Sequence, residues 1–269
     1  MKKSIVVSTQ PTKFSALAFK EDLEKNINKV ASLGFDGVEL AVRDPKFLDI
    51  EKVIHIIEGF NLEVPAIGTG QAWGEEGLSF SDSNEVVRKA AIERIKEQIK
   101  LASHFNAQVI IGLIRGVIKE GIFRDEAEKW TIDSLRECAE FGLEKNVRLT
   151  LEPVNRYESN FINTLQEGAE FIDRIGVSNI GLLADTFHMN IEEVSIYDSI
   201  VKTKNYITHV HFADSNRWAP GYGHLDFQKI VKTLKKIGYK GYVSAEILPL
   251  PDQDSAAEMT IKTLNKIIL

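Results

Sequence analysis

The chain has 269 residues, 43% of them hydrophobic, which is enough to bury a full core. Its formal net charge of −6 argues against a surface that binds polyanions such as nucleic acids. The single cysteine, Cys138, excludes a disulfide framework and fits a reducing compartment. The apolar run near the N-terminus is too short for a signal peptide, and no stretch approaches the length of a membrane span. These features predict a cytoplasmic protein with no membrane partner.

Short runs rich in Val and Ile alternate with amphipathic segments along the whole chain. The runs predict strands at 4–9, 37–42, 64–70, 107–114, 147–154, 180–186, 207–214 and 242–248. The amphipathic segments predict helices at 18–33, 47–59, 83–105, 125–145, 164–176, 190–204, 226–237 and 254–268. Capping-box spacing at helix starts is found for Thr164 with Glu167, Ser255 with Glu258, and Asp82 with Glu85.

Eight strand–helix units in strict alternation require parallel strands joined by crossovers. No GxGxxG motif follows the first strand, which argues against an open dinucleotide-binding sheet. No linker rich in Pro, Gly or Ser divides the chain. The pattern therefore predicts one α/β domain over residues 1–269, a single (β/α)₈ TIM barrel.

Polar residues end four consecutive predicted strands. Glu152 comes just before Pro153, which ends the fifth strand because proline cannot donate to a sheet ladder. Taken alone, such a glutamate is more often a solvated edge residue or half of an ion pair. However, the sixth, seventh and eighth strands end in Asp185, His211 and Glu246, and the active sites of barrels lie at these strand ends.

The four residues predict a divalent-metal site. Three carboxylates and one imidazole, with no thiolate, suit Mn²⁺, Co²⁺ or Mg²⁺ better than a structural zinc. Side chains alternate along a strand, so His209 shares a face with His211. Because His211 lies nearer the strand end, we expect it to be the ligand and His209 to be a hydrogen-bonded core residue.

Other polar groups follow the same strand ends. His188 and Arg217 would either point donors at an oxygen-rich ligand above the metal or serve in helix capping or packing. Arg115, after the fourth strand, would either grip a substrate carboxylate bidentately or pair with an acidic neighbour.

This set of residues suits proton transfer next to a ketone. A divalent ion that chelates the ketone and a neighbouring hydroxyl acidifies the C–H bond between them. A carboxylate then removes the proton, and inversion requires a second carboxylate on the opposite face of the planar enediolate. Glu152 and Glu246 are the expected catalytic pair, while Asp185 and His211 mainly hold the metal. An aldose–ketose isomerase would need only one catalytic acid.

The strand-end quartet resembles that of the D-tagatose 3-epimerase family, a group of xylose-isomerase-like barrels. The resemblance implies that Glu152 and Glu246 are acid and base as well as ligands. It also implies that Glu158, His188 and Arg217 contact the substrate, and that the protein is a homodimer or homotetramer.

Six stretches resemble the bacterial 5-keto-L-gluconate epimerases within that family. They are LAVRDP (40–45), AIGTGQA (66–72), VIIGLIRG (109–116), NRYESNFINT (155–164), ADTFHMNIEEV (184–194) and ADSNRWAPGYGHLDF (213–227). This resemblance implies interconversion of 5-keto-L-gluconate and D-tagaturonate, a step of inositol catabolism, with Mn²⁺ or a similar ion as the metal. Such a sugar acid needs a cation for its carboxylate, for which Arg115 and Arg217 are candidates.

Several alternatives remain open. Among enzymes they are a 3-epimerase of free ketoses such as D-tagatose or D-psicose, and a hydroxypyruvate or sugar-phosphate isomerase. An abasic-site endonuclease would need more histidines and a basic face, whereas the chain has six histidines and a negative charge. A non-catalytic sugar-binding barrel would have lost an acid or a ligand, and none of the four is missing.

Overall fold

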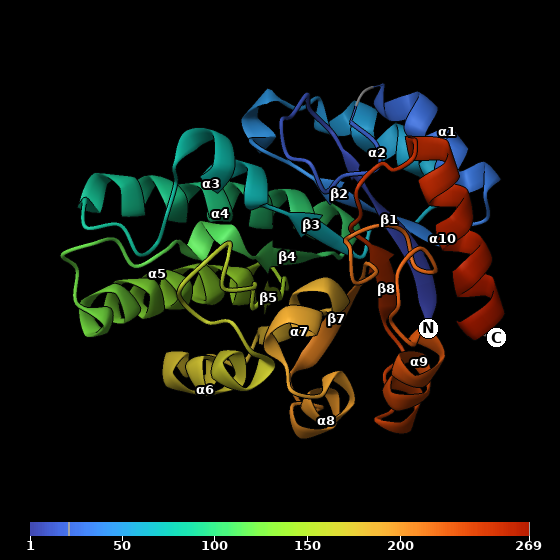
Figure 1. The fold of residues 1–269 in the computed structure, drawn as a ribbon. Helices are drawn as coiled ribbons and strands as arrows, with labels where there is room; N and C mark the ends of the chain where they lie inside the picture. Colours follow the sequence, from blue (N-terminus) through green and yellow to red (C-terminus); the bar gives the residue numbers. More distant parts are fainter. Residues whose placement is uncertain (21, 269) are drawn as a thin grey trace.

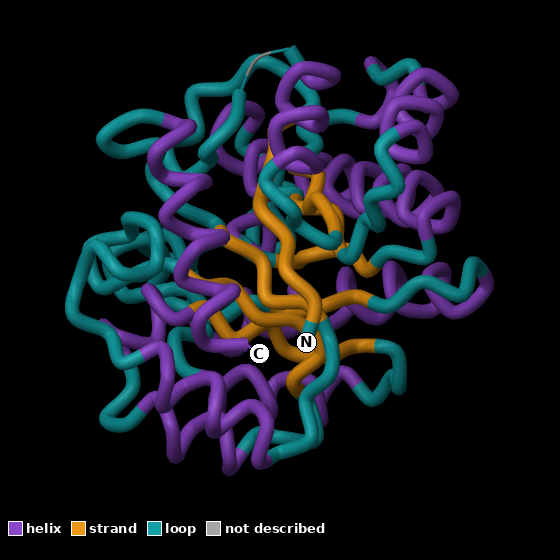
Figure 2. Tube along the Cα trace, turned by 90° about the vertical axis from the view of Figure 1, so that its right-hand side faces the viewer, coloured by secondary structure: helices purple, strands orange, loops and turns teal. Residues whose placement is uncertain are grey.

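The computed structural model describes residues 1–20 and 22–268, and its eight strands close into one parallel barrel surrounded by helices (Figures 1 and 2). The strands follow one another around the barrel in chain order, and β1 pairs with β8 to close it. The predicted (β/α)₈ barrel is therefore confirmed. Within the described residues, no helix is long and apolar enough to cross a membrane.

All eight predicted strands are present, most of them shorter than predicted. They are β1 (Lys2–Ser8), β2 (Gly37–Ala41), β3 (Ala66–Gly68), β4 (Gln108–Ile111), β5 (Leu149–Leu151), β6 (Ile180–Asp185), β7 (Ile207–Phe212) and β8 (Tyr242–Ala245). Their outward-facing side chains pack against the surrounding helices in a continuous apolar layer, which accounts for the Val- and Ile-rich composition of the runs.

The helices match the predicted segments with two differences. They are α1 (Leu23–Ser32), α2 (Ile50–Gly59), α3 (Gly70–Glu76), α4 (Glu85–Phe105), α5 (Arg124–Glu144), α6 (Leu165–Ile175), α7 (Thr186–Glu192), α8 (Ile196–Lys202), α9 (Phe227–Lys236) and α10 (Gln253–Ile268), with short 3₁₀ helices η1 (Pro45–Phe47) and η2 (Leu113–Arg115). Helix α3 was not predicted, and the segment 190–204 holds the end of α7 and all of α8. Helix α7 begins early because Asp185 Oδ1 accepts the main-chain N–H groups of Phe187 and His188.

One of the three predicted capping boxes is present, and the box at Asp82 is wrong because Asn84 caps the start of α4. Thr164 and Glu167 exchange both hydrogen bonds at the start of α6. The box at Ser255 is wrong, because α10 begins two residues earlier. There Asp252 accepts hydrogen bonds from the Ser255 N–H at 2.8 Å and from its hydroxyl at 2.7 Å.

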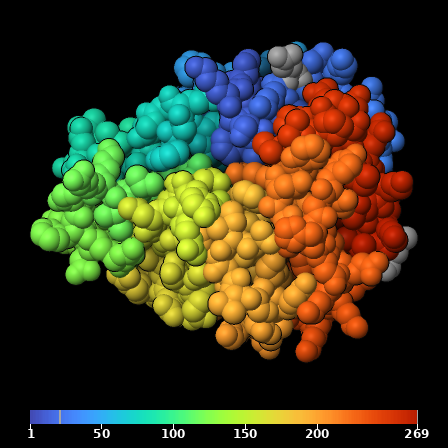
Figure 3. All heavy atoms as spheres, in the orientation of Figure 1, coloured from blue at the N-terminus to red at the C-terminus, as the bar shows by residue number. Residues whose placement is uncertain are grey.

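The C-terminal ends of β5 to β8 and the segments that follow them form one continuous part of the molecule. In the space-filling view these segments, coloured from yellow through orange to red, pack directly against one another (Figure 3). The parallel arrangement places the polar residue that ends each of these strands at one end of the barrel.

Candidate active site

Four consecutive strands bring the predicted ligands together. Glu152 follows β5, Asp185 ends β6, His211 lies in β7 and Glu246 follows β8. One ligand atom from each lies within 4.8 Å of the corresponding atoms of the others. His211 Nδ1 is 3.7 Å from Glu152 Oε1 and 3.7 Å from Asp185 Oδ2.

The atoms that face one another in this quartet lack hydrogen-bond partners. Glu152 Oε1, Asp185 Oδ2 and His211 Nδ1 are all buried, and none has a partner among the described residues. Buried polar atoms are normally paired, so three unpaired atoms at one point indicate a missing common partner. A divalent cation satisfies two carboxylate oxygens and an imidazole nitrogen at once, so this donor set fits a metal ion.

Burial and charge give the four residues different protonation states. Burial raises the pKa of Glu246 to about 8, with Arg217 opposing and Glu152 supporting the shift. Burial alone would lower the pKa of His211, but the nearby Glu39 and the quartet carboxylates raise it well above its usual value. Burial also opposes ionisation of Asp185, but neighbouring histidines and Arg217 lower its pKa to about 2. In the absence of a cation, Glu246 and His211 therefore hold protons at neutral pH.

Glu39 supports the quartet from within the barrel. It lies in the middle of β2, is 1% exposed, and its carboxylate is 3.0 Å from His211 Nε2 and 2.8 Å from His209 Nε2. The Nε2–H of His211 donates to Glu39, so Nδ1 is the nitrogen that remains for a cation. His209 is the hydrogen-bonded core residue that was expected. Glu39, His209 and His211 also have the composition of a metal site, but their facing atoms already bond to one another.

The sequence analysis missed Glu39, although its signal was visible. A charged residue in the middle of the otherwise apolar strand GVELA must be buried. Carboxylates are almost never fully buried unless they are paired, so this position required a cationic or metal-linked partner.

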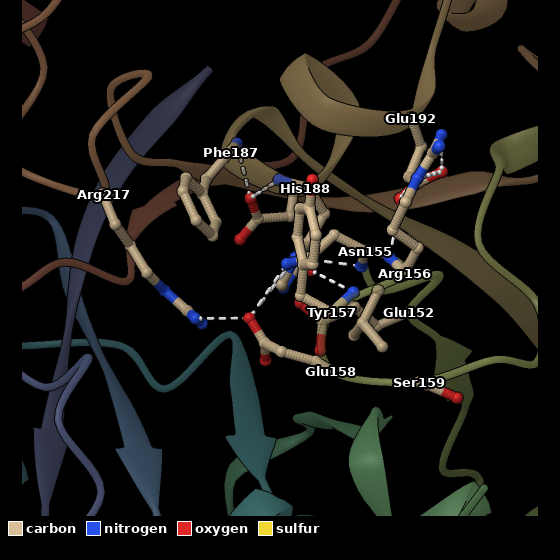
Figure 4. A network of polar contacts seen from close by, with 12 residues as sticks. Glu152, Asn155, Arg156, Tyr157, Glu158, Ser159, Phe187, His188, Glu192 and Arg217 are labelled. Carbon is tan, nitrogen blue, oxygen red and sulfur yellow. Dashed lines mark hydrogen bonds and ion pairs between the residues drawn. The ribbon is translucent and has the colours of Figure 1, made fainter.

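The three residues expected to contact the substrate lie along one wall of the cavity (Figure 4). Arg217 Nη1 donates to Glu158 Oε1 at 2.8 Å, and Nη2 donates to Glu246 Oε2 at 3.0 Å. The guanidinium also lies 5.0 Å from the centre of the Phe187 ring. His188 is buried on the same wall, with Nδ1 3.9 Å from Glu158 Oε1. This wall is therefore linked directly to one of the quartet carboxylates.

Arg115 is placed differently from the prediction. Its side chain is 0% exposed and does not line the cavity. It donates to four main-chain carbonyls, those of Gly112, Glu152, Phe161 and Ile162, at 2.8 to 3.0 Å. The expectation that Arg115 grips a substrate carboxylate is therefore wrong, and so is the alternative of a direct acidic partner. Instead it joins the ends of β4 and β5 to the loop before α6.

Comparison with known proteins gives the same architecture. The family model of the xylose isomerase-like TIM barrel matches residues 27–266. The L-ribulose 3-epimerase of Mesorhizobium japonicum is 33% identical over 87% of this chain and 78% of its own length. The 3-dehydro-D-guloside 4-epimerase of Escherichia coli is 30% identical over 85% of this chain and 88% of its own.

A solved structure of a related enzyme has the same fold over the whole length of this chain. The D-psicose 3-epimerase with D-tagatose from Clostridium cellulolyticum H10 superimposes with a TM-score of 0.84 at 26% identity, covering 100% of this chain and 99% of the other. The matched region includes all four quartet residues. The chain therefore belongs to the xylose isomerase-like TIM barrel family, in which these relatives are epimerases, enzymes of the isomerase class.

Proposed function

We propose that this protein is a divalent-metal-dependent epimerase that inverts the carbon next to the ketone of a keto-sugar or keto-sugar acid. The observation that carries the proposal is the set of unpaired buried atoms at the ends of β5, β6 and β7, completed by Glu246 after β8. This donor set suits Mn²⁺, Co²⁺ or Mg²⁺. The resemblance to the 5-keto-L-gluconate epimerases favours Mn²⁺ among them.

Glu152 and Glu246 are the proposed acid and base. They lie at strand ends three positions apart around the barrel, so they can flank a substrate held between them. One carboxylate removes the proton from the carbon, and the other, protonated, delivers a proton to the opposite face; the roles exchange in the reverse direction. Asp185 and His211 would hold the metal with them. A bound divalent ion would supply Lewis-acid polarisation of the ketone.

The chain's other residues on the cavity wall would bind the sugar. Glu158 accepts from substrate hydroxyls, while His188 and Arg217 donate to substrate oxygens. All three line the cavity that contains Glu152 and Glu246. Their contacts fix the orientation of the carbon between the two carboxylates, which is where much of an enzyme's rate advantage arises.

The proposed substrate pair is 5-keto-L-gluconate and D-tagaturonate. The support for this pair is the resemblance of the segments 184–194 and 213–227 to the 5-keto-L-gluconate epimerases. These two segments contain His188 and Arg217. A free ketose is the second candidate. Two relatives favour it, an L-ribulose 3-epimerase at 33% identity and a D-psicose 3-epimerase at 32% identity. Arg217 also favours it, because its guanidinium already donates to Glu158 and Glu246.

The test is proton–deuterium exchange in D₂O with Mn²⁺, followed by NMR on D-tagaturonate and D-tagatose. We expect label at the carbon next to the ketone and a higher kcat/KM for the keto acid. A higher value for D-tagatose would favour the second candidate, and no exchange with any ketose or keto acid would refute epimerisation. The variant Glu246→Gln should still bind metal but lose roughly 10²- to 10⁴-fold in turnover.

A further inference from the structure

We propose that Asn155 is a positioning residue that holds His188 in the tautomer protonated on Nε2, so that His188 presents a hydrogen-bond donor to the substrate. The residue lies in the loop after β5, is 1% exposed, and stands between His188 and Glu158 (Figure 4). Naming a sugar oxygen as the recipient of that donor rests on the proposed function. The tautomer itself follows from the contacts.

The orientation of the Asn155 amide is fixed at both ends. Its Oδ1 accepts the main-chain N–H of Tyr157 at 3.0 Å, which closes a turn within the loop. Its Nδ2 is 2.9 Å from Glu158 Oε1. That carboxylate oxygen also receives Arg217 Nη1 and so acts as an acceptor. A main-chain N–H requires the oxygen and a carboxylate requires the nitrogen, so the opposite amide orientation would lose both bonds.

This orientation determines the state of His188. The second N–H of Nδ2 points to His188 Nδ1 at 2.8 Å, and the main-chain N–H of Asn155 reaches the same atom at 3.3 Å. Both groups can only donate, so Nδ1 must accept and carries no proton. A neutral imidazole then has its proton on Nε2.

The Nε2 edge of His188 is the edge available to a ligand. The ring lines the cavity, and within residues 1–20 and 22–268 no hydrogen-bond partner is found for Nε2. An N–H group there suits a hydroxyl or carbonyl oxygen of the sugar. The opposite tautomer would present a lone pair instead, which repels a ketone oxygen.

Asn155 acts only through other residues. Besides His188 it holds Glu158, which in turn binds Arg217, and Arg217 reaches Glu246. A single amide thus orders one donor and one acceptor on the substrate-facing wall. This explains why a residue without chemistry of its own is fully buried in this loop.

The decisive variant is Asn155→Asp. It keeps the size of the side chain and the oxygen that binds Tyr157, but it replaces the donor beside His188 with an acceptor. We expect the proton to move to Nδ1 and kcat/KM to fall roughly 10- to 100-fold, as for the loss of one hydrogen bond to a developing charge. Asn155→Ala removes the donor without adding an acceptor and serves if the aspartate variant does not fold.

Asn163→Ala is the matched control. Asn163 belongs to the same loop, and its Nδ2 donates to the main-chain carbonyls of Val154 and Ser159, both at 2.7 Å. Its removal loosens the loop without altering the partners of His188. A loss of activity caused only by a looser loop would therefore appear in both asparagine variants.

The readout is the ring ¹⁵N spectrum of histidine-labelled protein loaded with diamagnetic Mg²⁺, with His188→Gln identifying the signal. We expect an unprotonated Nδ1 and a protonated Nε2 in the wild type and in Asn163→Ala, and a protonated Nδ1 in Asn155→Asp. A protonated Nδ1 in the wild type, or an unchanged spectrum in Asn155→Asp, would overturn the inference. If the spectra follow the expectation while no ketose or keto acid is turned over, the proposed function fails and the tautomer assignment stands.

Discussion

Metal binding by this protein should release protons, and the structure sets their number. Without a cation, Glu246 has a pKa of about 8 and His211 a pKa well above its usual value, whereas Asp185, at about 2, is already ionised. A metal ion competes with the proton on each of its ligands. A group with a pKa of about 8 is roughly 90% protonated at pH 7, so binding should release between one and two protons per ion.

The release of protons sets the direction in which the metal affinity changes with pH. Because both protons must leave, the apparent affinity for the metal rises with pH. The rise is roughly tenfold per pH unit for each proton released. Above pH 8 the contribution of Glu246 disappears, because that carboxylate is then already ionised.

Isothermal titration calorimetry at pH 7 measures this number. The apparent enthalpy of Mn²⁺ binding is compared in buffers that differ in ionisation enthalpy, and the slope gives the protons released. Glu246→Gln, which has no proton to lose at that position, should release about one fewer. Tight binding with no proton release, or the same slope for Glu246→Gln and the wild type, would refute the protonation states derived for the quartet.

Three further substitutions test the supports of the site. Glu39→Gln should weaken metal binding roughly 10- to 100-fold by calorimetry, because it removes the anionic partner of the ligand histidine. Gly112→Ala should lower metal affinity and turnover together, because its Cβ would lie 2.6 Å from Glu152 Oε2; unchanged affinity would show that the carboxylate moves freely. Arg115→Met should cost at least about 3 kcal/mol in urea unfolding, because four buried carbonyls lose their donor. It should change kcat/KM for D-tagaturonate and D-tagatose by the same factor, whereas a selective loss for the keto acid would restore Arg115 as a carboxylate anchor.

The quartet could be predicted because barrel topology converts sequence positions into neighbours. Once eight parallel strands are recognised, the residues at or just past the C-terminal ends of β5 to β8 must share one end of the barrel. Strand alternation and depth then distinguish His211, which lies beside Glu152 and Asp185, from His209, which is hydrogen-bonded to Glu39. The prediction of the quartet needed only the pattern of strands along the sequence.

The residues that support the site, Arg115 and Asn155, could not be predicted in the same way, because their roles depend on the direction in which each side chain points. The position of Arg115 after β4 suggests an exposed side chain. In the structure Arg115 lies in η2, is buried, and donates to main-chain carbonyls. Asn155 matters through an amide orientation that Tyr157 and Glu158 determine, and through the contact of that amide with His188, which is distant in the sequence. Helix α3 was missed because two of its seven residues are glycines, which disfavour a helix. In the folded protein, Gln71 and Ala72 of this helix are buried.

The charges around the cavity bear on how a keto acid would bind. Carboxylates are the most numerous charged groups in the lining: Glu39, Glu152, Glu158 and Glu246. Arg217 donates to Glu158 and Glu246, yet its Nε is a buried donor without a partner among the described residues. A substrate oxygen is the natural acceptor for that N–H. If the oxygen belongs to a carboxylate, KM for D-tagaturonate should rise with ionic strength while KM for D-tagatose does not. Equal salt dependence would place the substrate carboxylate away from Arg217, which would leave a neutral ketose as the better match for this wall.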